Sequence, residues 1–262
     1  MKSLARKVPD LLKNWDDVAK KIRRQRSVTV FLDFDGTLVA IAPRPDQVRL
    51  VPAAKKILLR LARHPLATLV VVSGRRRAEL LEHIGIPGIH YFGLYGWERN
   101  AKSLLPTKVR AALHHARVAL QPLLVAYPGL WIENKRNSLS VHLLHVPAAL
   151  LPGVRRDIRA HLKRFQKSLR AMENIRDVEI LPRSIPGKGI AVSQFLAQPV
   201  HRKSFPFYFG DDFSDESGFA AVKRGASVHV GHARPTRARY HLRAPAEVLK
   251  ALARLYALLS QS

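Results

Sequence analysis

The stretch "VTVFLDFDGTLVAI" at residues 28–41 carries two aspartates, Asp33 and Asp35, at the end of an apolar run. The run is rich in β-branched and aromatic residues, so it predicts a buried strand. Side chains at positions i and i+2 of a strand point the same way, so both carboxylates should enter one space where the strand ends. Gly36 follows and allows a sharp backbone turn. Two close carboxylates repel each other unless they share a proton or a cation, and the stretch therefore predicts a reactive or cation-binding site.

The segments around this stretch alternate between strand and helix patterns. Apolar strands are expected at 66–75, 89–96, 205–210 and 226–231, and helices at 8–22, 51–63, 77–84, 188–197, 213–223 and 245–260. Such alternation is typical of a mostly parallel sheet with helices on both faces. The intervening segment instead shows helices at 107–125 and 154–169, two strands within 130–146 and a strand at 176–183. We therefore predict an α/β fold with a Rossmann-like parallel-sheet core at 1–103 and 184–262 and an inserted α+β domain at 104–183.

The composition is strongly basic: the 262 residues include 45 lysines and arginines against 19 aspartates and glutamates, for a formal charge of +26. We interpret this charge mainly as an arginine-rich surface. The alternative is that it attracts anions, namely phosphorylated substrates, nucleic acid or an anionic membrane. The absence of cysteine excludes disulfides and thiolate-ligated metals. No apolar run reaches the ~18 residues of a membrane span, and the N-terminus lacks the apolar region of a secretory signal. A soluble, cytoplasmic protein without membrane contact is expected.

A second acidic cluster follows the predicted strand at 205–210, in the sequence "GDDFSDE". It contains Asp211, Asp212 and Asp215. Alone, such a cluster is equally typical of a helix N-terminus, where acidic residues are favourable. Together with Asp33 and Asp35 it predicts a site for a hard divalent cation such as Mg²⁺, which binds carboxylates and substrate phosphate.

Two further side chains lie between the acidic clusters, Ser73 in "VVVSGR" and Lys188 in "PGKG". A hydroxyl and an ammonium suit phosphate oxygens, although either residue alone would be an ordinary turn or surface residue. The order of "DFDGT", "VVVSGR", "GKG" and "GDDFSDE" resembles that of the haloacid dehalogenase-like phosphohydrolases. The resemblance implies a hydrolase core whose inserted domain is a substrate-selecting cap.

The resemblance also implies a role for each motif residue. Asp33 would be the nucleophile that forms an aspartyl-phosphate, and Asp35 the general acid and base. Ser73 and Lys188 would hold the transferring phosphoryl group, and Gly74 and Arg75 would bind substrate. Mg²⁺ would be held by the carboxylates of Asp33 and Asp211 and by the backbone carbonyl of Asp35. Asp212 and Asp215 would support the metal and its waters.

Within this superfamily the chain is most similar to the trehalose-6-phosphate phosphatases. The stretch "WIENKRNSLSVHLL" at 131–144 resembles their cap motif. The resemblance implies that Glu133 and Lys135 hydrogen-bond sugar hydroxyls of the substrate, and an exposed hairpin ion pair is the structural alternative. His142 is expected to be a packed or hydrogen-bonded strand residue rather than a catalyst.

Two positions depart from the family pattern. Tyr95 stands where that pattern has histidine, and Leu144 where it has arginine. These departures leave open another sugar phosphate, such as sucrose phosphate or a glycosyl phosphoglycerate, as the substrate. A non-catalytic nucleic-acid-binding protein is a remote alternative, because a polyanion site does not collect carboxylates without a metal. We expect a small sugar phosphate as the partner and a monomer.

Overall fold

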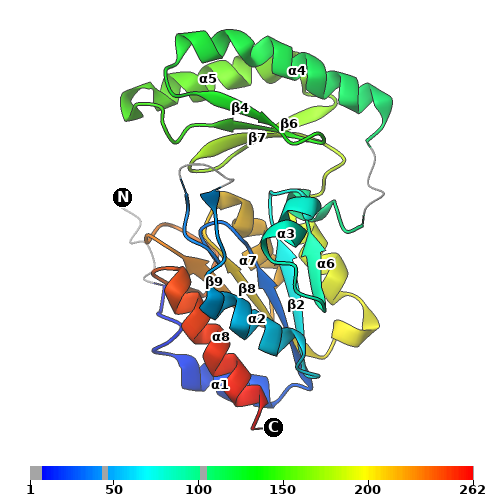
Figure 1. The fold of residues 1–262 in the computed structure, drawn as a ribbon, viewed down its shortest axis with the longest axis vertical. Helices are drawn as coiled ribbons and strands as arrows, with labels where there is room; N and C mark the ends of the chain where they lie inside the picture. Colours follow the sequence, from blue (N-terminus) through cyan, green and yellow to red (C-terminus); the bar gives the residue numbers. More distant parts are fainter. Residues whose placement is uncertain (1–7, 43–46, 101–104, 262) are drawn as a thin grey trace. The chain divides into compact units, whose positions relative to one another are not determined.

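The computed structural model of this chain describes residues 8–42, 47–100 and 105–261 (Figure 1). It forms two compact units: unit 1 comprises Met1–Arg99 and Gly187–Ser262, and unit 2 comprises Asn100–Pro186. The boundaries between the units lie at 99/100 and 186/187, a few residues from the expected 103/104 and 183/184. The expected boundary at 103/104 lies outside the described residues. Each unit is described below by itself.

Unit 1 contains a six-stranded sheet in which every pair of neighbouring strands is parallel. Its strands are β1 (Ser27–Leu32), β2 (Ala67–Val72), β3 (Ile89–Phe92), β8 (Ser204–Gly210), β9 (Ala226–Val230) and β10 (Tyr240–Leu242). They lie in the order β10-β9-β8-β1-β2-β3, which confirms the predicted parallel α/β core. The strand β10 was not predicted, because three residues are too few to show a periodic pattern.

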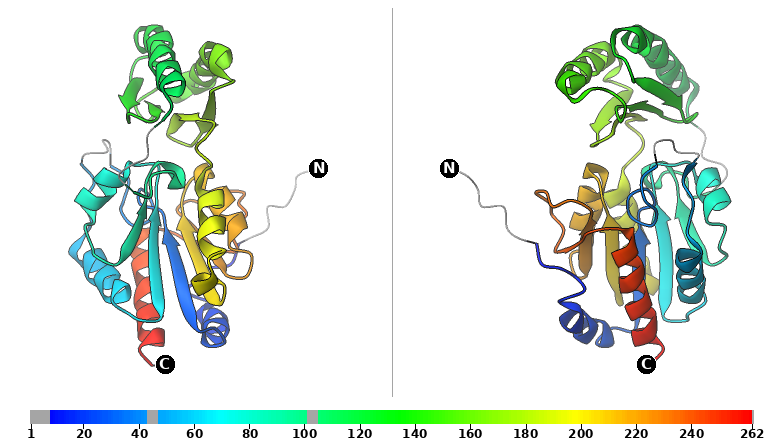
Figure 2. Two further views of the ribbon diagram at one scale, coloured as in Figure 1. Left: turned by 90° about the vertical axis from the view of Figure 1, so that its right-hand side faces the viewer. Right: turned by 60° about the vertical axis from the view of Figure 1, so that its left-hand side comes forward.

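Helices cover both faces of this sheet (Figure 2). They are α1 (Trp15–Arg23), α2 (Pro52–Ala62), α3 (Arg77–His83), α6 (Lys188–Leu196), α7 (Glu216–Ala221) and α8 (Pro245–Leu259), with 3₁₀ turns η2 (Leu94–Gly96), η5 (Pro199–His201) and η6 (Phe213–Asp215). Alternate residues of β1 serve the two faces: Val28 and Val30 pack with α1, α2 and α8, whereas Phe31 packs with α6 and α7. The continuous apolar runs of the sequence therefore reflect burial on both sides.

The predicted N-terminal helix at 8–22 is wrong at its start, since α1 begins at Trp15. The carboxylate of Asp10 accepts hydrogen bonds from the backbone N–H groups of Leu12 and Lys13 at 2.8 and 3.1 Å. The backbone N–H of Leu11 donates to the carbonyl of His241. An aspartate that satisfies its own following N–H groups forms a turn in place of a helix.

Unit 2 contains a four-stranded antiparallel sheet in the order β4-β5-β7-β6. The strands are β4 (Trp131–Asn134), β5 (Leu139–His142), β6 (Leu169–Glu173) and β7 (Asp177–Pro182). Helices α4 (Thr107–Ala126) and α5 (Leu151–Leu162), with turns η3 (Ala148–Leu150) and η4 (Lys163–Phe165), lie over one face of this sheet (Figure 1). The predicted helix at 154–169 is thus too long. The helix ends at Leu162, and η4 and a turn at 166–168 lead into β6. Strand β6 itself was not predicted, because "LRAME" has helix-favouring residues and only its pairing with β7 overrides that preference.

Among the described residues, no helix combines the length and the apolar character that a membrane span requires.

Candidate active site

Three neighbouring strands of unit 1 end at the same edge of the sheet, and each is followed by a polar side chain. Asp33 follows β1, Ser73 follows β2 and Asp211 follows β8. All three are buried, with 5%, 2% and 8% of their surface exposed. In an open parallel sheet, ligands bind beyond the carboxyl ends of the strands, so the sequence motifs meet where this fold is able to hold a substrate.

Lys188, the first residue of α6, joins two of the acidic groups. Its Nζ donates hydrogen bonds to Oδ1 of Asp33 and to Oδ1 of Asp215, each at 2.7 Å. Burial alone would lower the pKa of Lys188, but the carboxylates of Asp215 and Asp33 outweigh it and raise that pKa. Lys188 therefore stays charged, and it forms a fixed cation beside Asp33.

Asp215 is fully buried and accepts four hydrogen bonds. Its Oδ1 accepts from Lys188 and from the hydroxyl of Tyr208 at 2.7 Å. Its Oδ2 accepts from the backbone N–H groups of Asp211 at 3.1 Å and Asp212 at 3.0 Å. The carboxylate thus fixes the loop after β8, and Asp215 lies within the site itself.

Tyr208 was not identified from the sequence. It lies in β8, and its hydroxyl is the only side-chain polar group in "FPFYFG". Burial raises the pKa of Tyr208, and the nearby Asp215 carboxylate raises it further, so the phenol remains a hydrogen-bond donor. A lone hydroxyl in a buried strand, just before an acidic cluster, was the available signal.

The charge of Asp33 depends on its surroundings. Burial raises the pKa of Asp33 to about 7, Lys188 acts in the opposite direction, and the carboxylates of Asp215 and Asp35 add to the increase. Near neutral pH, and without a bound cation, Asp33 is therefore a mixture of its protonated and ionised forms.

Carboxylate oxygens of Asp33, Asp211 and Asp215 lie within 4.8 Å of one another. Gly36, at a φ of 81°, makes this possible, since a Cβ at that position would lie 2.1 Å from Oδ2 of Asp211. Three buried oxygen donors of this kind suit a hard divalent cation. The side chain of Asp212 instead caps the turn η6 by accepting from the N–H of Phe213 at 2.6 Å.

Asp35 is held by a two-pronged contact with Arg75. The Nε and Nη2 groups of Arg75 donate to the two carboxylate oxygens of Asp35 at 2.7 and 2.8 Å. Arg75 is itself fixed by His83, whose Nε2 lies 3.3 Å from its Nη1, and by the ring of Phe34 at 5.3 Å. In this arrangement Arg75 orients Asp35, a contact that the sequence did not indicate.

The segment after β2 packs closely against the loop that contains Tyr95. The backbone carbonyl of Ser73 accepts from the N–H of Tyr95 at 2.8 Å, and the Ser73 hydroxyl accepts from the N–H of Arg75 at 3.2 Å. A Cβ at Gly74 would lie 2.7 Å from the Tyr95 hydroxyl. Tyr95 has a φ of 58°, in the left-handed region that costs side-chain-bearing residues energy. The departure from the family pattern at this position therefore contacts the predicted site directly.

In unit 2, Glu133 and Lys135 belong to a polar cluster in which Lys135 and Glu179 are buried and Glu133 is partly exposed. Lys135 Nζ donates to Oε1 of Glu179 at 2.6 Å and lies 3.9 Å from Oε2 of Glu133. His142 bonds the same Glu133 oxygen at 2.9 Å and stacks on Trp131 at 3.8 Å, which confirms a hydrogen-bonded strand residue. The Glu133–Lys135 ion pair that the structural alternative expected is present, but it is not exposed at Lys135, which is 9% exposed and also pairs with Glu179.

Glu179 is the residue of this cluster that the sequence did not single out. It lies on β7, directly opposite Ser140 of β5, and is 1% exposed. Burial raises the pKa of Glu179 to about 7, with Lys135 acting in the opposite direction. Burial alone would lower the pKa of Lys135, but Glu179 and Glu133 raise it. The sequence carried no signal for this burial, because the alternation of "DVEIL" places Glu179 on the strand face opposite to Val178 and Ile180, where an exposed side chain is expected.

Solved structures share this fold. The C-terminal domain of the Candida albicans trehalose-6-phosphate phosphatase matches with a TM-score of 0.84, over 96% of this chain and 99% of that one, at 21% identity. The sucrose-phosphatase from Synechocystis matches with a TM-score of 0.53, over 87% and 98% of the two chains, at 20% identity. At these identities the likeness concerns the fold alone.

Sequence relatives are more similar. The trehalose-phosphate phosphatase of Mycobacterium tuberculosis is 33% identical over 245 residues, which cover 88% of this chain and 61% of that protein. A probable trehalose-phosphate phosphatase of rice is 28% identical over 270 residues, covering 95% and 71%. The chain thus spans about three fifths of the length of the mycobacterial relatives. The family model for trehalose-phosphatase matches residues 31–246, a range that contains every motif of the site described above, and the chain therefore belongs to the trehalose-phosphatase family.

Proposed function

We propose that this chain hydrolyses trehalose 6-phosphate to trehalose and phosphate through an aspartyl-phosphate intermediate. The observation that carries the proposal is the contact of Asp33 with Lys188, 2.7 Å apart, beside the carboxylates of Asp211 and Asp215. The family supports the choice of substrate, since relatives named trehalose-phosphate phosphatases share 33% identity with the chain.

In the first step a carboxylate oxygen of Asp33 attacks the phosphorus, and the bond from phosphorus to the sugar oxygen breaks. For this step Asp35 must carry a proton, which displaces one of its two hydrogen bonds from Arg75. Asp35 then gives that proton to the departing sugar oxygen, so trehalose leaves as a neutral alcohol. In the second step Asp35 takes a proton from water, whose oxygen attacks the phosphorus and releases phosphate from Asp33. Lys188 and Ser73 hold the phosphoryl oxygens in line for both displacements.

We propose that Asp33 and Asp211, with the backbone carbonyl of Asp35, bind Mg²⁺, while Asp215, whose oxygens already accept four hydrogen bonds, positions Lys188 and the loop after β8. When bound, such an ion neutralises charge on the phosphoryl oxygens. The burial of Asp33 and Asp211 supports the assignment, because their carboxylate oxygens lie within 4.8 Å of each other and two close negative charges are costly unless they share a cation.

Proton and cation should compete for Asp33. Because the pKa of Asp33 is raised to about 7, the group holds a proton at lower pH and the cation must displace it. We expect the Kd for Mg²⁺ to fall about tenfold for each unit of pH up to about 7 and then to level off. Calorimetric titration with MgCl₂ at three pH values between about 6 and 8, without substrate, measures this.

The matched variant is Asp33→Asn, which cannot exchange this proton and should bind Mg²⁺ more weakly and with little dependence on pH. A wild-type affinity that does not change over this range would contradict the role of Asp33 as a ligand. Activity should also disappear with EDTA and return with excess Mg²⁺.

We propose that unit 2 is the cap that selects the sugar, with Glu133 binding its hydroxyl groups. Glu133→Ala should lower kcat/KM for trehalose 6-phosphate about ten- to a hundredfold, because a lost hydrogen bond to a charged group costs roughly 1.5–3 kcal/mol. p-Nitrophenyl phosphate has no sugar hydroxyls and should be hydrolysed nearly as before. Phosphate release from both compounds measures the difference.

The same assay with sucrose 6-phosphate and glucosyl phosphoglycerate is the control for substrate identity. Wild-type preference for either one over trehalose 6-phosphate would replace our substrate while leaving the phosphatase chemistry. An equal loss of activity toward the sugar and the aryl phosphate in Glu133→Ala would instead show that Glu133 serves the fold.

A further inference from the structure

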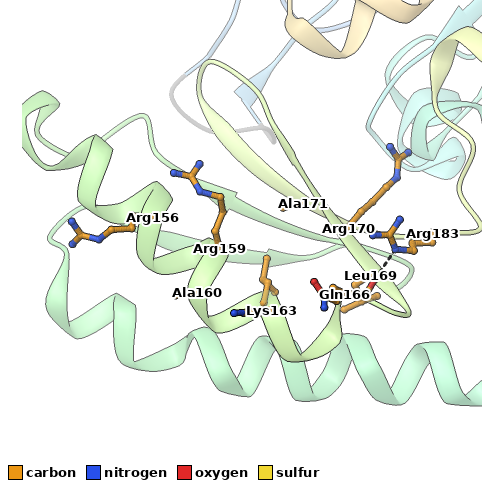
Figure 3. Close-up of a pocket in the computed structure, with 10 residues that line it drawn as sticks. Arg156, Arg159, Ala160, Lys163, Gln166, Leu169, Arg170, Ala171 and Arg183 are labelled. Carbon is orange, nitrogen blue, oxygen red and sulfur yellow. Dashed lines mark hydrogen bonds between the residues drawn. The ribbon is translucent and has the colours of Figure 1, made fainter.

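Unit 2 contains a groove of about 540 Å³ between α5, the turn η4 and strand β6 (Figure 3). Its apolar lining includes the buried side chains of Leu162 and Leu169. Among the described residues no acidic side chain lines it, whereas five cationic ones do: Arg156, Arg159, Lys163, Arg170 and Arg183. We call this the α5–β6 groove, and its lining favours an anionic occupant.

The cations are spread along the groove. Arg156, Arg159 and Lys163 follow one another at three- and four-residue spacing, which is one face of a helix and spans ~10 Å along its axis. Figure 3 shows the guanidinium groups of Arg156 and Arg159 separated rather than converging on one point. Such a row fits an extended polyanion better than a single phosphate.

Several of these cations are available to a ligand. Within the described residues, no hydrogen bond or ion pair engages Nζ of Lys163. Arg183 uses its Nε to bond the backbone carbonyl of Gln166 at 2.6 Å. The side chains of Arg156 and Arg159 are 73% and 55% exposed in their ion pairs with Asp157 and Glu173. Exposed ion pairs contribute little to stability and exchange easily for an incoming carboxylate.

Strand β6 is an edge of its sheet, and its free side opens on the groove. The N–H of Arg183 donates to the carbonyl of Ser168, and the N–H of Asn174 donates to the carbonyl of Asp177. In an antiparallel pair every second residue bonds the partner strand, so the even-numbered residues of β6 bond β7 and the odd-numbered ones do not. By that alternation Leu169 and Ala171 turn their backbone N–H and C=O groups away from β7. Both residues line the groove, and in the described part of the chain no hydrogen bond uses these outward groups.

We propose that the α5–β6 groove binds an extended, acidic peptide segment of a partner protein, which adds to β6 as a further strand. Its backbone would pair with the outward groups of Leu169 and Ala171. Acidic side chains on alternate residues of such a strand are ~6.8 Å apart and would meet the cations of α5 and η4.

The chemistry of the edge favours a peptide over other polyanions. The free side of β6 offers both donors and acceptors, and a phosphate polymer has no donor for the carbonyl groups. No aromatic side chain of the described residues lines the groove, so bases of a nucleic acid would find no stacking surface. Charges on an edge strand can also serve only to prevent pairing with another edge, and the experiment must separate that role from binding.

The test is fluorescence anisotropy with a labelled ten-residue peptide that alternates glutamate and threonine, using the full chain in ~0.15 M salt. Lys163→Glu should weaken binding by about tenfold or more, since it places a repulsive charge among the cations that line the groove. Lys167→Glu is the matched control: it makes the same charge change at an exposed lysine outside the groove lining, and binding should stay within about twofold.

Backbone pairing is tested separately. A peptide of the same sequence with alternate backbone nitrogens methylated keeps its charge and loses its edge hydrogen bonds, so it should bind at least about tenfold more weakly. Ala171→Pro removes one outward N–H that the β6–β7 ladder does not use, and should weaken the unmodified peptide. Circular dichroism checks the fold of each variant.

Three results would overturn the proposal. Equal losses in Lys163→Glu and Lys167→Glu would show attraction by overall charge. Equal binding of the methylated peptide, with displacement by inorganic polyphosphate, would show an anion site without strand addition. No saturable binding of the peptide would leave the charged edge as protection against aggregation.

Discussion

Asp33→Asn is expected to lower kcat for phosphate release by a factor on the order of 10⁴–10⁶, the range found when the central nucleophile of a catalytic group is removed. Asparagine keeps the shape of the side chain, and its amide oxygen can still accept the hydrogen bond from Lys188. What it loses is the negatively charged oxygen that attacks phosphorus. Steady-state phosphate release measures the loss, and acid-quenched incubation with ³²P-labelled substrate should trap radioactivity on the wild-type protein only.

The control for this variant is Asp17→Asn, which makes the same chemical change on the exposed surface of α1. It should keep wild-type kcat and wild-type labelling. Covalent labelling or near-normal turnover in a folded Asp33→Asn protein would show that another group attacks the phosphate.

Lys188→Met is expected to have two large effects. It removes the cation that faces the phosphoryl oxygens, which should lower kcat by roughly 10²–10³. It also leaves the buried carboxylates of Asp33 and Asp215 without their shared partner. Breaking a buried ion pair on one side costs about 3–5 kcal/mol, so the free energy of unfolding should fall by that amount in urea denaturation.

Lys203→Met is the matched control, since Lys203 is an exposed lysine of unit 1. It should change neither kcat nor the denaturation midpoint measurably. If Lys188→Met lowers stability but leaves kcat intact once the remaining folded fraction is taken into account, Lys188 supports the fold and does not act on the phosphate.

The parallel core could be predicted because its signals are local and strong. The run before Asp33 and the run before Ser73 are long, apolar and β-branched, and parallel pairing brings their ends together whatever the loops do. Strand β6 could not be predicted, since its residues favour helix and only pairing with β7 makes them a strand. The start of α1 was missed for a related reason, because the carboxylate of Asp10 competes for the backbone.

The site divides in the same way. The aspartates and Lys188 carry a sequence spacing, so their convergence could be expected before the structure was known. Tyr208 and Glu179 belong to no motif with a characteristic spacing. Their roles depend on hydrogen-bond partners, Asp215 and Lys135, that only the fold brings close. For Arg75, the sequence motif predicted a residue of the site. Its hydrogen bonds to Asp35 could not be predicted, because they depend on where β1 and β2 end.

The four hydrogen bonds accepted by Asp215 have a consequence for the energy of the reaction. In water, solvent dipoles must reorient whenever charge moves from an attacking oxygen to a leaving one, and this reorientation forms part of the barrier. Here the ammonium of Lys188, the hydroxyl of Tyr208 and two backbone N–H groups are already oriented around one carboxylate. The free energy needed to orient these groups is spent when the protein folds, so it does not add to the barrier of each turnover. A site built in this way is selected for the placement of its charges at the expense of maximal stability, so stabilising substitutions should be sought away from the loop after β8.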